Sequence, residues 1–126
     1  MAVLVTAEDD EDIRTIVTRS LRRAGHSVIA VADGVQGLAA VRAHHPDAVI
    51  TDVDMPHMNG LQLCREIRRD PRLKHIPVVV VSGSIDSHDA QALEAGVTMI
   101  LPKPFVADDL LRHLTEVLAH PSLQHR

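Results

Sequence analysis

Short apolar runs alternate along the chain with longer segments in which apolar residues recur every three or four positions. The runs that read as strands are Val3–Ala7, Val28–Val31, Ala48–Thr51, Pro77–Val81 and Thr98–Leu101. Because they are apolar throughout rather than alternating with polar residues, they are typical of parallel strands covered on both faces. The pattern therefore predicts a fold in which strands and helices alternate.

The intervening segments have the period of amphipathic helices. They are expected over residues 11–24, 33–44, 61–69, 87–95 and 107–120. In the first, Ile13, Ile16, Val17 and Leu21 fall on one stripe that should face the core, and in the second Val35, Leu38 and Ala39 should do so. Asp33 is a suitable N-cap for the second helix, and Gly25 and Gly96 are suitable stops after the first and fourth.

Five strand–helix units with short connections favour one topology. Parallel crossovers are right-handed, so the expected fold is α/β, a doubly wound five-stranded parallel sheet with flavodoxin-like order 2-1-3-4-5 and helices on both faces. We expect residues 1–126 to form a single domain. The first and third strands then lie side by side at the point where the strand order reverses, which is where such sheets bind ligands.

Polar residues of the kinds that phosphate chemistry uses follow four of the predicted strands. Glu8 and Asp9 follow the first strand, Asp52 the third, Ser82 the fourth and Lys103 the fifth. Three carboxylates that share one edge repel one another unless protons or a cation lie between them, and Mg²⁺ prefers such oxygen ligands. Asp52 could then both bind the metal and attack a phosphoryl group, while Lys103 supplies positive charge and Ser82 a hydroxyl donor.

Each of these residues alone also has an ordinary structural explanation. An acidic residue after a strand is often the N-cap of the next helix, and for Asp10 or Glu11 this is the better interpretation. Asp52 alone would be a loop aspartate, Ser82 a turn residue and Lys103 a solvated surface residue. Their joint occurrence at successive strand ends favours the functional interpretation.

Composition, net charge and the placement of cysteine and histidine argue against several classes of function. The chain has 126 residues, 45% of them hydrophobic, and a net charge of −4, which argues against direct nucleic-acid binding because that requires a basic face. The sole cysteine, Cys64, lies on the apolar face of its helix, and the scattered histidines do not predict a metal site. No apolar stretch is long enough for a membrane span and no leader is evident, so a cytoplasmic protein is expected.

Four sequence motifs together resemble the receiver domain of the two-component response-regulator family over the whole chain. They are the acidic pair Glu8-Asp9, the stretch from Asp52 to Gly60 that contains Met55-Pro56, the pair Ser82-Gly83, and Lys103-Pro104-Phe105. Three departures stand out: Ile100 occupies the position of a common aromatic switch residue, Asp54 adds a fourth carboxyl, and Pro102 precedes the lysine.

The resemblance implies a phosphoacceptor signalling domain rather than an enzyme. A sensor histidine kinase or histidine phosphotransfer domain would phosphorylate Asp52, and Mg²⁺, for which Mn²⁺ could substitute, would be held by Glu8, Asp9, Asp52 and the backbone carbonyl of Asp54. Ser82, Gly83 and Lys103 would bind the phosphoryl group, Ile100 would occupy the switch position, and the Lys103–Pro104 peptide would be cis. An output partner would bind the face formed by the fourth helix, fifth strand and fifth helix, and phosphorylation could also promote a homodimer.

Three alternatives remain at this point. A haloacid-dehalogenase-type phosphatase uses the same aspartyl-phosphate chemistry, but its paired aspartates follow the first strand and it needs a cap for which this chain is short. A flavodoxin would carry a phosphate loop rich in Ser, Thr and Gly, whereas Glu8-Asp9-Asp10 would repel phosphate. A receiver-like interaction module that is not phosphorylated is the third.

Overall fold

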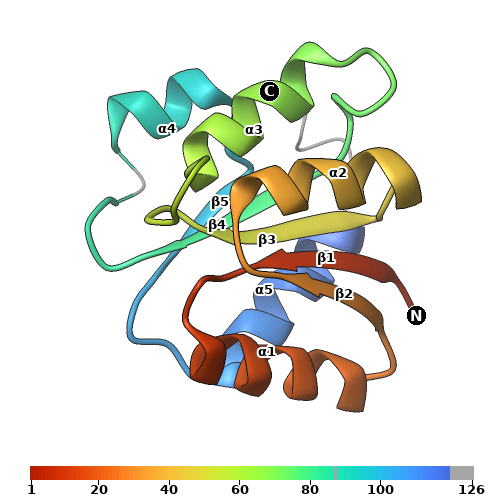
Figure 1. Cartoon of the computed structure of the whole chain (residues 1–126). Coiled ribbons are helices and arrows are strands. Elements are labelled where there is room, and N and C mark those ends of the chain that lie inside the picture. The colour runs from red at the N-terminus through yellow and green to blue at the C-terminus, as the bar shows by residue number, and fades with distance from the viewer. Residues whose placement is uncertain (87, 120–126) are drawn as a thin grey trace.

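The computed structural model describes residues 1–86 and 88–119. A five-stranded parallel sheet occupies its centre, with strand order β2-β1-β3-β4-β5 (Figure 1). The strands are β1 (Val3–Ala7), β2 (Ser27–Val31), β3 (Ala48–Asp52), β4 (Val78–Ser82) and β5 (Met99–Pro102). The helices are α1 (Glu11–Arg23), α2 (Gly34–His44), α3 (Gly60–Arg69), α4 (Ala90–Ala95) and α5 (Ala107–Ala119). The predicted topology and strand order are confirmed.

Helices cover both faces of the sheet. Figure 1 shows α2, α3 and α4 on one face and α1 and α5 on the other. Side chains alternate along β1 accordingly, since Val5 joins the core beneath α2 and α3 whereas Leu4 joins the core beneath α1 and α5. Strands β3 and β4 are buried along their whole length, as a sheet covered on both faces requires.

Side-chain caps fix where the helices begin. Asp10, Asp33 and Asp89 each accept a hydrogen bond from a backbone amide in the first turn of α1, α2 and α4. At α3, Asn59 and Gln62 form a reciprocal capping box. The expected caps at Asp10 and Asp33 are therefore confirmed.

The structure corrects the sequence prediction at the start of one helix and at three residues expected in the core. Helix α4, expected to begin at residue 87, begins instead at Ala90, because Asp89 caps it there; Ser87 lies outside the described part of the chain. Ile16, expected in the core, has 62% of its surface exposed, and Val35 has 52%. Ala39 is also exposed, because α2 approaches the sheet through other residues, namely Gly34, Gly37, Leu38, Ala40 and Val41.

Two glycines hold the loop that follows β3 close to its neighbours. A Cβ on Gly60 would lie 2.0 Å from the carbonyl oxygen of Asp52, and one on Gly34 would lie 2.2 Å from that of Met58. No side chain fits at either position, so the start of α3 and the start of α2 pack directly against the backbone of this loop. The close approach fixes the backbone beside Asp52.

Among the described helices, none is long and apolar enough to span a membrane.

Candidate functional site

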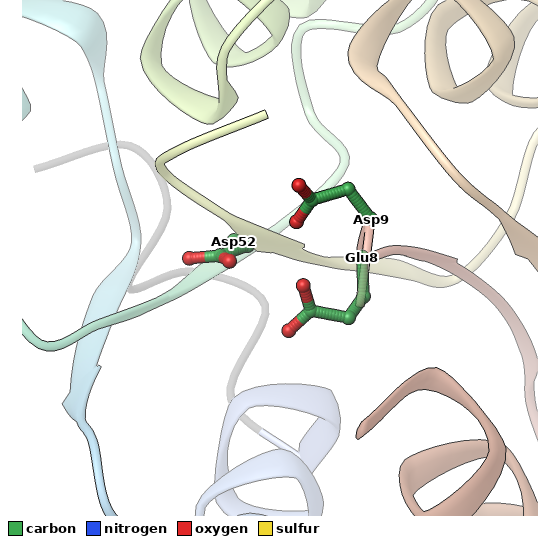
Figure 2. A group of neighbouring side chains, drawn as sticks. All are labelled: Glu8, Asp9 and Asp52. Carbon is green, nitrogen blue, oxygen red and sulfur yellow. The ribbon is translucent and has the colours of Figure 1, made fainter. Parts of the chain in front are cut away.

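Three carboxylates meet at the carboxyl ends of β1 and β3. Glu8 and Asp9 directly follow β1, and Asp52 is the last residue of β3. Each of the three offers an oxygen that lies within 4.8 Å of the others. Figure 2 shows the carboxylates of Glu8 and Asp9 reaching from the end of β1 toward Asp52. The predicted acidic cluster therefore forms at the point where the strand order reverses.

Hydrogen bonds from three elements hold Glu8 in place. Its backbone N–H donates to the Val31 carbonyl at 3.1 Å, which extends the pairing of β1 with β2 by one residue. Its carboxylate Oε2 accepts the Asp10 N–H at 3.2 Å, and its carbonyl accepts Nη1 of Arg14 at 2.9 Å. Glu8 is only 8% exposed, whereas Asp9 is exposed, so the two members of the acidic pair face different surroundings.

Asp52 is held with similar firmness. Its Oδ1 accepts the Val53 N–H at 2.8 Å, and its backbone carbonyl accepts the Thr51 hydroxyl at 2.9 Å. The side chain is 10% exposed, which leaves a narrow approach from solvent. The carboxylate is therefore oriented by the backbone before any ligand arrives.

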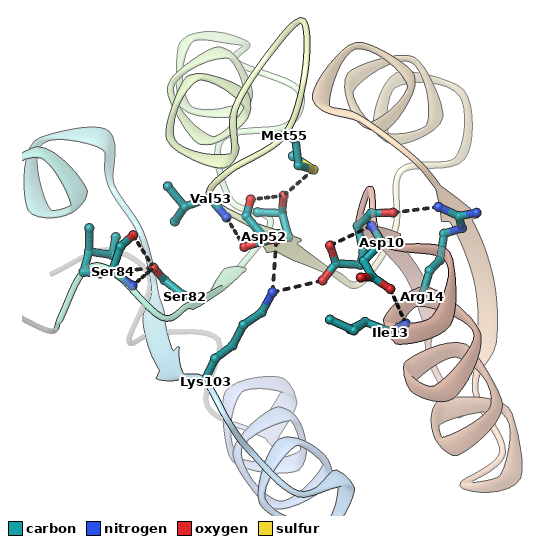
Figure 3. Close-up of polar contacts among 12 residues, drawn as sticks. Asp10, Ile13, Arg14, Asp52, Val53, Met55, Ser82, Ser84 and Lys103 are labelled. Carbon is teal, nitrogen blue, oxygen red and sulfur yellow. Dashed lines mark hydrogen bonds and ion pairs between the residues drawn. The ribbon is translucent and has the colours of Figure 1, made fainter.

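Lys103 bridges the two less exposed carboxylates. Its Nζ donates to Glu8 Oε1 at 3.2 Å and to Asp52 Oδ2 at 3.1 Å (Figure 3). Its backbone N–H donates to the Ser82 carbonyl at 2.9 Å, which ties the end of β5 to the end of β4. The Lys103–Pro104 peptide bond is cis, the geometry that the family resemblance implies.

Burial and the neighbouring charges shift the pKa of two groups in the site. Burial raises the pKa of the Glu8 carboxyl to about 7 against the opposing hydrogen bond from the Asp10 amide, and the charge of Asp52 adds to the rise. Burial works to lower the pKa of the Lys103 ammonium, but its hydrogen bonds and charge interactions with Asp52 and Glu8 outweigh that effect and raise it. Lys103 is therefore positively charged at neutral pH, while Glu8 is close to its titration midpoint.

The predicted switch residues lie nearby but bond elsewhere. The Ser82 hydroxyl accepts the amides of Ser84 and Ile85 at 3.0 and 3.1 Å, so it closes its own turn and is not bonded to Asp52. Gly83 lies next to Lys103, since a Cβ built on it would be 3.8 Å from that of the lysine. Ile100 is partly buried and packs against the core beneath α3 and α4.

Asp54 lies two residues beyond Asp52, in the loop between β3 and α3, and its side chain is exposed. Sequence reasoning missed Arg14 as a support for the cluster and Ser84 as the partner of Ser82 across a 3.1 Å hydroxyl–hydroxyl contact. No sequence motif marks Arg14 for this role, because any long side chain with a donor near the start of α1 could reach the Glu8 carbonyl.

The donor set suits a hard divalent cation. Three carboxylates supply oxygen ligands only, which Mg²⁺ and Mn²⁺ prefer over softer nitrogen or sulfur donors. The three carboxylates outnumber the one ammonium group that contacts them, Lys103. The residues therefore fit a metal that binds beside Lys103.

Comparison with known proteins identifies one family. The family model described as "Response regulator receiver domain" matches residues 3–115. The response regulator MprA of Mycobacterium sp. (strain KMS) is 35% identical over 119 residues, covering 94% of this chain and 51% of that protein. The transcriptional regulatory protein CseB of Streptomyces avermitilis is 39% identical over 112 residues, covering 88% and 46%. The chain thus spans about half the length of the curated relatives it matches.

Solved structures agree. The chemotaxis response regulator CheY4 of Vibrio cholerae superposes with a TM-score of 0.87 at 30% identity, covering 93% of this chain and 98% of that one. The receiver domain of the sensor histidine kinase PA1611 from Pseudomonas aeruginosa, solved with a magnesium ion in its active-site cleft, superposes with a TM-score of 0.86 at 28% identity, covering 94% and 98%.

Proposed function

Because this chain belongs to the receiver domain family of two-component response regulators, we propose that Asp52 is its phosphoacceptor. The observation that carries the proposal is the bridge that Lys103 makes between Glu8 and Asp52. A buried aspartate held beside an ammonium group and two further carboxylates is arranged to receive a phosphoryl group together with a metal ion.

In the proposed reaction, a carboxylate oxygen of Asp52 attacks the phosphorus of a phosphohistidine. The new bond joins that oxygen to phosphorus, and the phosphorus–nitrogen bond of the donor breaks with its electron pair staying on the histidine ring. The Val53 amide holds Oδ1 and thereby fixes the carboxylate plane. Lys103, which contacts Oδ2, can move its ammonium group to the incoming phosphoryl oxygens and offset their charge.

We propose Mg²⁺ as the metal, with Mn²⁺ able to substitute. Glu8, Asp9 and Asp52 would hold it through their carboxylates, and Asp54 through its backbone carbonyl. When bound, the metal supplies positive charge against which the phosphoryl oxygens and the carboxylates can approach one another. The magnesium ion of the PA1611 receiver domain supports the choice.

We propose that phosphorylation is read out by the segment that follows β4. To donate to a phosphoryl group, the Ser82 hydroxyl would turn from the Ser84 hydroxyl toward Asp52, which would weaken the hydrogen bonds that it accepts from the amides of Ser84 and Ile85. Gly83 leaves room beside Lys103 for this change. Ile100, being β-branched, has few side-chain states to exchange, so the change would pass through the backbone between Ser82 and Gly96 rather than through that side chain.

Receiver domains of response regulators interact with histidine kinases and output domains. We propose that a histidine kinase or histidine phosphotransfer domain is the donor here, and that the output partner binds the face formed by α4, β5 and α5. On that face Leu93 is 66% exposed, and it lines a shallow apolar depression with Val97, Met99 and Ile100. A homodimer formed on phosphorylation would use the same face.

The family assignment does not favour the phosphatase and flavodoxin alternatives. We further propose that the domain catalyses only its own phosphorylation and dephosphorylation, since the depression at Asp52 is small, about 20 Å³, and holds no room for an organic substrate.

The test is intact-mass spectrometry after incubation with phosphoramidate and Mg²⁺. The native protein should gain one phosphoryl group, EDTA should prevent the gain, and Asp52→Asn should abolish it. Asp54→Asn is the matched control, because it removes an exposed carboxylate two residues away and leaves the backbone carbonyl in place. A phosphoryl group that remains on Asp52→Asn, or that forms equally in EDTA, would refute the assignment.

A further inference from the structure

A groove lined by arginines runs between α1 and the edge strand β2, and of its lining residues only Arg14 contacts a member of the acidic cluster, through the Glu8 carbonyl. Its volume is about 580 Å³, within the range of small-molecule sites, and it is open to solvent. It is lined by Arg14, Thr15, Thr18, Arg19, Arg22, Arg23 and Ala30. No carboxylate lines it, although the chain as a whole has a net charge of −4.

The four guanidinium groups are not neutralised by the protein. Elsewhere on the described surface Arg69, Arg72 and Arg112 pair with carboxylates, whereas within residues 1–86 and 88–119 none of the four groove arginines makes an ion pair. Arginines three or four positions apart on a helix repel one another. The last-turn arginines gain from the helix dipole, but Arg14 and Arg19 lie too early in α1 to do so.

Two of the four arginines are already held in position. Arg14 donates to the Glu8 carbonyl at 2.9 Å, and Arg22 donates through Nη2 to the Val28 carbonyl at 3.1 Å. A side chain that is held before binding loses less entropy when a ligand arrives. Both arginines keep further N–H donors that these single bonds do not use.

The floor of the groove contains an unsatisfied hydroxyl. Thr18 is 7% exposed, and its Oγ1 has no hydrogen-bond partner among the described residues. The oxygen is itself buried, so a change of side-chain rotamer would be needed to bring it to the groove. Buried hydroxyls without a partner are uncommon and call for an explanation, which a bound anion would supply.

We propose that this groove binds a small anion that carries a chain of phosphate groups. Four positive charges lie within ten residues of helix, a length of about 14 Å. A triphosphate chain concentrates up to four negative charges within that length, whereas a peptide would need a carboxylate at nearly every facing position. Guanidinium groups also match phosphate oxygens with paired hydrogen bonds. A nucleoside triphosphate and inorganic polyphosphate share this chemistry.

The experiment is isothermal titration of the native chain, in EDTA, with sodium tripolyphosphate and separately with ATP. EDTA keeps metal-dependent binding at Asp52 out of the measurement, so the result does not depend on the phosphoacceptor assignment. We expect saturable binding of one anion per chain. Amide shifts should fall on residues 14–23 and 27–31. Equal affinity for the two ligands would assign the site to the phosphate chain alone, and tighter binding of ATP would assign it to a nucleotide.

The matched variants are Arg19→Gln with Arg23→Gln in the groove, and Arg65→Gln with Arg69→Gln on α3. Both pairs remove two positive charges, but only the first pair lines the groove. We expect the groove pair to weaken binding at least tenfold and the α3 pair to weaken it less than twofold. Equal weakening by both pairs, absence of saturable binding, or tighter binding of a polyglutamate peptide than of either phosphate ligand would overturn the proposal.

Discussion

The elevated pKa of Glu8 makes a quantitative prediction for the metal-free protein. An ordinary glutamate, as in the unfolded chain, has a pKa of 4.5, and in the fold that of Glu8 is about 7. Between these values the folded state keeps a proton that the unfolded state has lost. The free energy of unfolding therefore falls as pH rises through this window, because the unfolded state binds fewer protons.

The size of the effect follows from the shift. Each unit of pKa difference corresponds to about 1.4 kcal/mol, so the full shift amounts to roughly 3 kcal/mol lost between pH 4.5 and pH 8. Because Glu8 is only 8% exposed, screening by solvent reduces this free-energy change only slightly. Glu8→Gln keeps the shape of the side chain and removes its titration. The variant should thus match the native protein at pH 4.5 and exceed its stability at pH 8 by up to about 3 kcal/mol.

Urea unfolding in EDTA at several pH values between 4.5 and 8 measures this difference. Subtracting the native curve cancels the other titrating groups that the two proteins share. Glu116→Gln, which changes an exposed glutamate on α5, is the control for removing a surface carboxylate outside the cluster. A Glu8→Gln protein whose stability changes with pH in parallel with the native protein, or that is less stable at pH 8, would refute the reasoning.

Three further perturbations test the neighbouring structure. Gly60→Ala should lower the free energy of unfolding, measured in urea, by about 2 kcal/mol or more, because the added Cβ would lie 2.0 Å from the Asp52 carbonyl oxygen. Gly83→Ala is the control: its Cβ would make only an ordinary contact at 3.8 Å, so the free energy of unfolding should change by less than about 0.5 kcal/mol. Lys103→Gln should slow phosphorylation by phosphoramidate more than tenfold while the far-ultraviolet circular dichroism stays native, and an unchanged rate would show that the ammonium group plays no part. Ile100→Val should leave the amide shifts caused by beryllofluoride between Ser82 and Gly96 nearly intact; loss of those shifts would make the Ile100 side chain the switch.

The sheet and its order were predictable because local signals agreed with one another. Each apolar run was bounded by residues that stop a strand or cap a helix, and Asp10 and Asp33 cap as their positions predict. Right-handed crossovers then left few topologies. The acidic cluster followed from the topology, since adjacency of β1 and β3 places Glu8 and Asp52 together whatever the loop details.

The helical spacing of apolar residues predicted burial wrongly at Ile16 and Val35, because the same spacing also occurs where an apolar residue lies at the surface. Ile16 lies on the same stripe as Val17, yet it is 62% exposed, because it lines the outer wall of a depression shared with Phe105 and Leu110. The apolar stripe of α1 is wider than the area that contacts the sheet, so an apolar residue at the edge of the stripe stays exposed. Val35 is exposed because the buried face of α2 includes two glycines, Gly34 and Gly37, whose lack of a side chain gives no apolar signal in the sequence.

The hydrogen bonds inside the site could not be predicted from the sequence for a different reason. Motifs indicate which residues share an edge but not which of them bond, and Lys103 contacts a carboxylate 95 positions away. Lys103 contacts the two buried carboxylates, Glu8 and Asp52, and their burial depends on packing that the motifs do not encode. The same burial raises the pKa of Glu8.

A metal that binds this cluster must displace a proton from Glu8 below neutral pH, so metal affinity should rise with pH up to about 7 and level off above it. Titrating Mg²⁺ binding at pH 6 and pH 8 checks this, and equal affinities at both would show that Glu8 is already ionised in the metal-free fold.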